Sequence, residues 1–227
     1  LELDVSNITF RYSGVRPLPY ADVANPGDVS RDHVVHVDHL PDADIPVLSL
    51  VGGKWTTFRG FAESVADDVL KRLARPRTIS TRELAIGGGR DFPLTPADRT
   101  VWVKGLAASG SISTERAETL LTRYGTSAST IASYCAQVHD HAHDRALESE
   151  PSLTVHEVRY LCEREMVTHL ADLIFHRTTM ALSGQLSVAL LDEVAAVAAQ
   201  ALKWDVTREA REIEAASTTA LRHGMTL

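Results

Sequence analysis

The chain has 227 residues, of which 44% are apolar and 23% charged, a composition typical of a globular protein with one large core or two small ones. Its 30 acidic and 23 basic residues give a net charge of −7, so a nucleic-acid partner, which requires a basic excess, is not expected. With only two cysteines, a disulfide framework is excluded and a reducing compartment, the cytoplasm, is predicted.

Neither a membrane span nor a secretion signal is predicted, because the sequence has no run of 18 apolar residues and no charged leader followed by an apolar stretch. The chain opens at Leu1 rather than at Met, inside a strand-like run. This opening predicts that the sequence is a piece of a larger protein.

The first fifty residues contain β-prone runs at 5–12, 34–37 and 45–51. The third run, IPVLSLV, is nearly all apolar and is followed by Gly52-Gly53, as is typical of a strand buried on both faces in the centre of a parallel sheet. Apolar residues then recur at steps of three and four over 55–74, which predicts a helix. The expected unit is a strand, a glycine turn and a long helix.

The helix is predicted to end at Arg75-Pro76-Arg77, because proline lacks the N–H donor that a helix needs. Residues 78–91, which include Gly87-Gly88-Gly89, are predicted to form a connector. Beyond residue 95 every segment has helical spacing. We expect an α+β fold, mostly α overall, with a strand-containing segment at 1–75, a linker at 76–94 and an all-α domain at 95–227.

Helix ends in the second half are marked by specific residues. Thr95-Pro96 predicts an N-cap followed by proline in the first turn, and Gly125 predicts a C-terminal cap. Thr154 and Glu157 have the spacing of a capping box, in which each side chain binds the backbone N–H of the other residue. These signals favour a self-contained bundle of about five or six helices.

The glycine turn is also the first candidate site. Glycines at a helix start let a ligand approach the backbone, and the free N–H groups there attract an anion. Lys54 adds a full positive charge, and Thr56 adds a hydroxyl. A simple tight turn explains the glycines equally well, but a lysine at a helix start opposes the helix dipole unless an anion compensates it.

Two arginines in the same half, Arg16 and Arg31, lie outside the predicted helices, Arg16 directly before a proline and Arg31 just before the second run. Each of them taken singly is most simply a solvated surface residue. Together with Lys54, they would suit a small dianion, because arginine binds phosphate oxygens through two parallel hydrogen bonds and lysine acts as a point charge.

Three motifs carry a resemblance: YSGVRPL at 12–18, SRDH at 30–33 and LVGGKWTTFR at 50–59. In this order and spacing they resemble the carboxy-terminal motifs of the FAD-dependent glycerol-3-phosphate dehydrogenases, a branch of the glycine-oxidase and amino-acid-oxidase-like flavoproteins. The stretch 84–89 resembles the family's glycine connector. Residues 157–165 and 172–178 resemble its helical-domain signature.

The resemblance implies a reaction in which FAD takes a hydride from sn-glycerol 3-phosphate, giving dihydroxyacetone phosphate, and electrons pass to quinone. It implies that Gly52, Gly53, Lys54 and Thr56 contact the flavin. Arg16, Arg31 and Lys54 would hold the substrate, with Arg16 nearest the reacting carbon as the catalytic residue. Members of the family are often peripheral on the cytoplasmic membrane, but no basic amphipathic helix is evident in this sequence.

A GxGxxG turn, which binds the ADP half of FAD in such enzymes, is absent from these 227 residues. We therefore expect that the chain alone binds FAD weakly or not at all and is inactive. Two alternatives stay open: a related amino-acid or hydroxy-acid oxidase, and a non-catalytic helical interaction module that forms a homodimer or docks a partner. A metal site at His139, His141 and His143 is not expected, because their spacing matches no standard zinc pattern.

Overall fold

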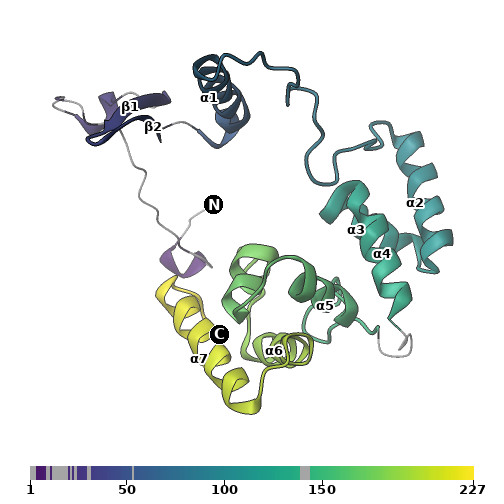
Figure 1. Ribbon diagram of the computed structural model, residues 1–227. Helices are drawn as coiled ribbons and strands as arrows, with labels where there is room; N and C mark the ends of the chain where they lie inside the picture. Colours follow the sequence, from purple (N-terminus) through teal and green to yellow (C-terminus); the bar gives the residue numbers. More distant parts are fainter. Residues whose placement is uncertain are drawn as a thin grey trace. The chain divides into compact units, whose positions relative to one another are not determined.

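The computed structural model describes residues 4–8, 11, 20, 22, 25–29, 32–52, 54–138 and 144–227. They form two compact units, one within residues 13–85 and the other combining residues from 1–12 and 86–227. The first contains a two-stranded sheet and helix α1, and the second contains helices α2 to α7 (Figure 1). The expected α+β class, mostly helical, is confirmed.

The sheet of the first unit is a hairpin of β1 (Val34–Leu40) and β2 (Ala43–Val51). The strands are antiparallel, with Val34 opposite Val51 and Val37 opposite Leu48. Only Pro41 and Asp42 separate the two strands, and so short a connection can join only antiparallel neighbours. The predicted strands at 34–37 and 45–51 are thus confirmed.

The predicted environment of β2 is wrong. In the described residues its one neighbour is the antiparallel β1, and Ile45 and Leu50 are 57% and 52% exposed. An apolar run shows only that a strand can be buried, whereas the short turn after β1 decides which strand pairs with it. The β-prone run at 5–12 also differs, because Val5–Asn7 forms a 3-10 turn. The Asn7 side chain accepts the Asp4 N–H at 2.8 Å and so favours the turn over a strand.

Helix α1 (Phe58–Arg72) follows a 3-10 turn at Trp55–Thr57 and ends before Pro76, as predicted. Its buried side chain is Phe61, whose ring stacks on that of His33, with 4.2 Å between the ring centroids. His33 directly precedes β1, so this contact packs α1 against the start of the hairpin.

Glu63 attaches the segment after α1 to the helix. Its carboxylate accepts hydrogen bonds from the Thr81 N–H, from the Thr81 hydroxyl at 3.0 Å and from the Ser80 hydroxyl at 2.8 Å. Arg77 pairs with it at 3.1 Å. The hydrogen bond from the Thr81 backbone is the largest of the effects that lower the pKa of Glu63 to about 2.

We predict that this attachment is lost in acid. Because the pKa of Glu63 is lower in the folded chain than its ordinary value of 4.5, its stabilising effect is complete above that value and declines as the pH falls toward 2. The protection factor of the Thr81 amide, its exchange rate relative to an unstructured peptide at the same pH, should fall over this range. Glu63→Gln should give fast exchange already at neutral pH, while Glu83→Gln, on the exposed side of the same segment, should not; equal exchange in all three proteins would contradict the prediction.

The second unit begins with α2 (Pro96–Gly110), α3 (Thr114–Tyr124) and α4 (Ala128–Gln137). It continues with α5 (Val155–Arg164), a π-helix (Asp172–Arg177), α6 (Val188–Leu202) and α7 (Val206–Arg222). Two apolar clusters form its core, one among α2, α3 and α4 and the other among α5, the π-helix, α6 and α7. Tyr124 and Tyr160 pack against both clusters and so connect them.

The predicted caps are confirmed at α2 and α3. The Thr95 hydroxyl accepts the Asp98 N–H at 3.1 Å, and Gly125 ends α3 with a positive φ. The capping box at α5 is formed only in part. Thr154 accepts the Glu157 N–H at 3.3 Å, but the Glu157 carboxylate binds α3 instead. No helix in the described part of the chain is both long and apolar enough to cross a membrane.

Candidate functional site

The first candidate site is the turn between β2 and α1. The strand ends at Val51 and the 3-10 turn begins at Trp55, so Gly52, Lys54 and Thr56 lie together within one short connection. All three residues are exposed. The predicted sequence of strand, glycine turn and helix is confirmed here, and it presents a cation and a hydroxyl at the start of a helix.

Gly52 is required by the backbone of this turn. Its φ is +78°, a conformation that residues with a side chain rarely adopt. A Cβ on Gly52 would also lie 2.7 Å from the carbonyl oxygen of Asp32. The glycine therefore allows the end of β2 to pass close to the chain that leads into β1.

Lys54 is held by its backbone, and its side chain is exposed. Its N–H donates to the Thr57 hydroxyl at 3.2 Å, and its carbonyl accepts the Thr57 N–H at 3.0 Å. These bonds fix the start of the 3-10 turn. The ammonium group and the Thr56 hydroxyl remain accessible, and the helix behind them carries a partial positive charge. The turn can thus bind an anionic group.

The other three predicted residues, Arg16, Arg31 and Gly53, lie outside the described residues. The structure therefore brings together Gly52, Lys54 and Thr56. His139, His141 and His143 lie outside the described residues as well. Among the residues that are described, no group of three or more His, Cys, Asp or Glu side chains could hold a metal ion.

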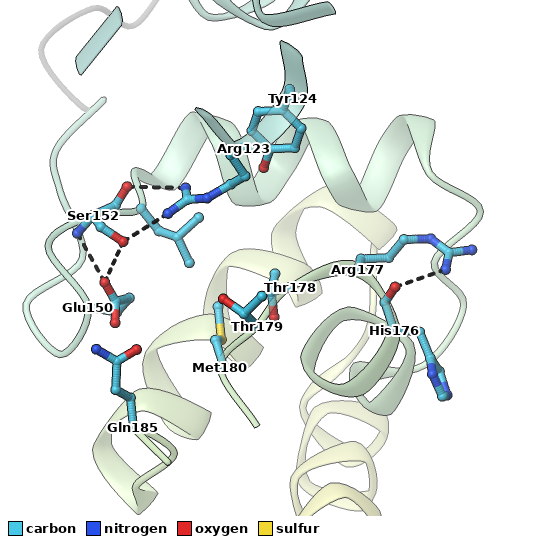
Figure 2. A pocket seen from close by; sticks show the side chains of 11 residues that line it. Arg123, Tyr124, Glu150, Ser152, His176, Arg177, Thr178, Thr179, Met180 and Gln185 are labelled. Atoms are coloured by element: carbon cyan, nitrogen blue, oxygen red, sulfur yellow. Dashed lines mark hydrogen bonds between the residues drawn. The ribbon is translucent and has the colours of Figure 1, made fainter. Parts of the chain in front are cut away.

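A second candidate site, which the sequence reasoning missed, is a cavity in the helical unit (Figure 2). It has a volume of about 300 Å³. Its walls come from the end of α3, the loop before α5, and the π-helix with the segment that follows it. The lining residues are Arg123, Tyr124, Glu150, Ser152, Leu153, His176, Arg177, Thr178, Thr179, Met180 and Gln185.

Behind this cavity lies a buried ion-pair network centred on Glu157, which is fully buried. Its Oε2 accepts a hydrogen bond from Arg116, and its Oε1 accepts bonds from Arg123 and from the Tyr124 hydroxyl, both at 2.6 Å. Arg116 and Arg123 are seven residues apart, two turns along α3, which places them on one face of the helix. That spacing is the sequence signal that could have revealed the network.

The network shifts the pKa values of its members. Burial alone would lower the pKa of Arg123, but the charge and hydrogen bond of Glu157 outweigh this effect and raise it. Burial raises the pKa of Tyr124, and the Glu157 carboxylate raises it further. Both side chains therefore keep their protons at neutral pH, and Glu157 retains two cations and a phenol as hydrogen-bond donors.

Comparison with known proteins identifies the family. Residues 79–209, more than half of the chain, match the C-terminal domain of alpha-glycerophosphate oxidase. A glycerol-3-phosphate dehydrogenase of Synechocystis sp. is 31% identical over 80% of this chain and 32% of its own length. A mitochondrial glycerol-3-phosphate dehydrogenase of Rattus norvegicus is 29% identical over 96% of this chain and 29% of its own length. The chain thus spans about a third of the length of these relatives.

A solved structure has a related fold. The glycerol-3-phosphate dehydrogenase from Bacillus halodurans, crystallised with FAD, superposes with a TM-score of 0.59 at 21% identity, over 82% of this chain and 36% of that one. The α+β arrangement found here is therefore a known fold. With the match over 79–209, the chain belongs to the family of the C-terminal domain of alpha-glycerophosphate oxidase.

Proposed function

We propose that this chain works as part of an FAD-dependent glycerol-3-phosphate dehydrogenase, which oxidises sn-glycerol 3-phosphate to dihydroxyacetone phosphate. The proposal rests on the family match over residues 79–209, together with the turn that presents Lys54 and Thr56 at the start of α1. The exposed ammonium group of Lys54 at a helix start is the observation that supports a phosphate ester, because such a turn provides both a positive charge and free backbone N–H groups for phosphate oxygens.

The residues of this turn fit a flavin. Gly52 carries no side chain that would hinder a planar ligand, and Thr56 offers a hydroxyl beside the positively polarised start of the helix. FAD, when bound, would supply the acceptor for the hydride that leaves C2 of the substrate. We assign cofactor contacts to Gly52, Gly53, Lys54 and Thr56.

Substrate binding is assigned to three cations. Lys54 and Arg31 would bind the phosphate, and Arg16 would lie closest to the reacting carbon, so that the substrate is held in one orientation for hydride transfer. The roles of Arg16 and Arg31 rest on the family resemblance of the motifs that contain them.

The same resemblance supports a division of labour along the chain. Residues 1–75 would belong to the flavin and substrate domain, residues 76–94 would link the two domains, and residues 95–227 would form an accessory helical domain. Formation of a homodimer belongs to the alternative in which the helical domain is an interaction module. Quinone as electron acceptor, and a cytoplasmic enzyme peripheral on the membrane, also rest on the resemblance. The chain alone would bind FAD weakly and be inactive, since it contains no GxGxxG turn.

Substrate preference tests the proposal. The natural gene product that contains this chain, purified with its flavin, should reduce an artificial electron acceptor with sn-glycerol 3-phosphate and not with lactate or glycine. A preference for the carboxylate substrates would instead support a hydroxy-acid or amino-acid oxidase. No turnover with any of them, from a protein that binds no flavin, would leave the helical interaction module as the function.

We predict that Lys54→Ala in that gene product raises the KM for sn-glycerol 3-phosphate at least about tenfold, because one charge-assisted hydrogen bond to the phosphate is lost. Because Lys54 is also assigned a cofactor contact, the flavin content of each protein is measured and the KM values are compared per bound flavin. Lys71→Ala is the matched control, since Lys71 is an exposed lysine near the other end of α1, and it should leave the KM unchanged. Equal KM values for all three proteins would refute a substrate contact at Lys54.

A further inference from the structure

The cavity of the helical unit has polar groups whose hydrogen-bonding capacity is not used within the described chain. Glu150 is 8% exposed, and its Oε1 accepts hydrogen bonds from the N–H and the hydroxyl of Ser152. Among the described residues, none donates to its Oε2. This carboxylate oxygen is therefore available as a strong acceptor for a molecule in the cavity.

Gln185 supplies the complementary group. Its side-chain oxygen accepts the Ser183 hydroxyl at 2.7 Å, which leaves the amide NH2 as a donor. The Gln185 amide lies on the same side of the cavity as Glu150, while Thr179 and Met180 lie on the other side (Figure 2). The cavity thus offers an acceptor, a donor and, at Thr179, a hydroxyl that acts as either.

The charges around the cavity disfavour an ionic ligand. Arg123 is paired with Glu157 at 2.6 Å, and Arg177 donates to the backbone carbonyls of Glu165 and His176 at 2.7 and 3.3 Å. An anion would meet the carboxylate of Glu150, and a cation would meet two guanidinium groups. Like charges brought together in this way are costly, whereas a neutral molecule with hydroxyl groups meets neither penalty.

The remaining wall is apolar. Leu153 and Met180 line the cavity and are almost fully buried. They provide a surface for a short carbon chain, and the volume of about 300 Å³ lies at the lower end of ligand sites. We propose that the cavity binds a small uncharged polyol, with one hydroxyl donating to Glu150 Oε2 and its neighbour accepting from Gln185. The proposal does not depend on the function proposed above.

The three methionines allow a direct test with the 227-residue chain. Met180 lines the cavity, Met166 is 86% exposed on the surface, and Met225 is buried in the core. With ¹³C-labelled methionine methyl groups, a xylitol titration should shift the Met180 signal along a saturating curve. The signals of Met166 and Met225 should move little, which separates binding from the general effect of polyols on protein surfaces.

Variants locate the binding. Glu150→Gln should raise the Kd for xylitol at least about tenfold, because a hydrogen bond to a charged group is weakened. Gln185→Leu should raise the Kd by a smaller factor, because the hydrogen bond lost is that of an exposed, neutral amide. Glu214→Gln, at an exposed position on α7, should leave it unchanged. The proposal fails if Met180 shifts in proportion to Met166 without saturation. It also fails if both cavity variants bind as the wild type, or if sn-glycerol 3-phosphate saturates Met180 at lower concentration than xylitol.

Discussion

Glu157→Gln is expected to lower the free energy of unfolding of the helical unit by about 3–5 kcal/mol, the range found when one partner of a buried ion pair is removed. The neutral amide would leave Arg116 and Arg123 without a counter-charge although their side chains are only 17% and 29% exposed. Tyr124 would lose its carboxylate acceptor as well. Urea unfolding followed by circular dichroism measures the loss.

Glu118→Gln is the matched control. Glu118 pairs with Arg99, but the two side chains are 46% and 33% exposed, and exposed pairs contribute at most about 1 kcal/mol. If the two variants were destabilised equally, the Glu157 network would not be what joins α3 to α5. The difference between them therefore measures the effect of burial on the same substitution.

Gly88→Ala is expected to detach the glycine connector from the turn between α3 and α4. A Cβ on Gly88 would lie 1.9 Å from the carbonyl oxygen of Tyr124 and 2.8 Å from the Cα of Gly125, so backbone would have to move. Three hydrogen bonds would be lost. The Gly88 carbonyl accepts the Thr126 N–H at 2.8 Å and the Thr126 hydroxyl at 3.0 Å, and the Gly88 N–H donates to the Ser127 hydroxyl at 3.0 Å. We expect a destabilisation of about 1–3 kcal/mol, typical of overpacking, and faster hydrogen exchange at the Thr126 amide.

Gly105→Ala should change the stability of the unit in the opposite direction. Gly105 lies within α2, and a Cβ there would meet nothing within 4 Å, so alanine should stabilise the unit by about 0.5–1 kcal/mol through its helix propensity. A Gly88→Ala protein that unfolds at the wild-type urea concentration and keeps the Thr126 amide protected would show that the close contact is not needed.

Local features of this fold follow directly from the sequence. The N-cap of Thr95, the end of α3 at Gly125 and the glycine turn after β2 depend on residues within a few positions of one another, where side-chain chemistry determines the backbone. Pro76 likewise marks where α1 has to end. These elements were predictable because each is determined by its own neighbours in the chain.

The pairing of β2 was not predictable in the same way. An apolar run such as 45–51 is compatible with either sheet direction, and the short turn at Pro41 and Asp42, which makes the pairing antiparallel, is a weak signal beside it. The partner of the Glu157 carboxylate differs from the predicted one for a related reason. Its spacing from Thr154 matches a capping box, but Arg116 and Arg123, 41 and 34 residues away, offer charges that a backbone N–H does not.

The two candidate sites differ in the same way, one being local in the sequence and the other assembled by tertiary packing. Gly52, Lys54 and Thr56 lie within five residues, so their convergence could be predicted from sequence. The helical-unit cavity draws on residues from Arg123 to Gln185, and its shape depends on how α3 and the π-helix pack. Tertiary packing of this kind leaves no short motif in the sequence.

The most direct test of the proposed function is anaerobic reduction of the flavin in the natural gene product that contains this chain. Adding sn-glycerol 3-phosphate should bleach the oxidised flavin absorbance, and Lys54→Ala should require at least about tenfold more substrate for half-maximal bleaching. Bleaching by lactate or glycine but not by sn-glycerol 3-phosphate would contradict the account. So would a wild-type response in the Lys54→Ala protein, because the turn after β2 would then have no part in binding the phosphate.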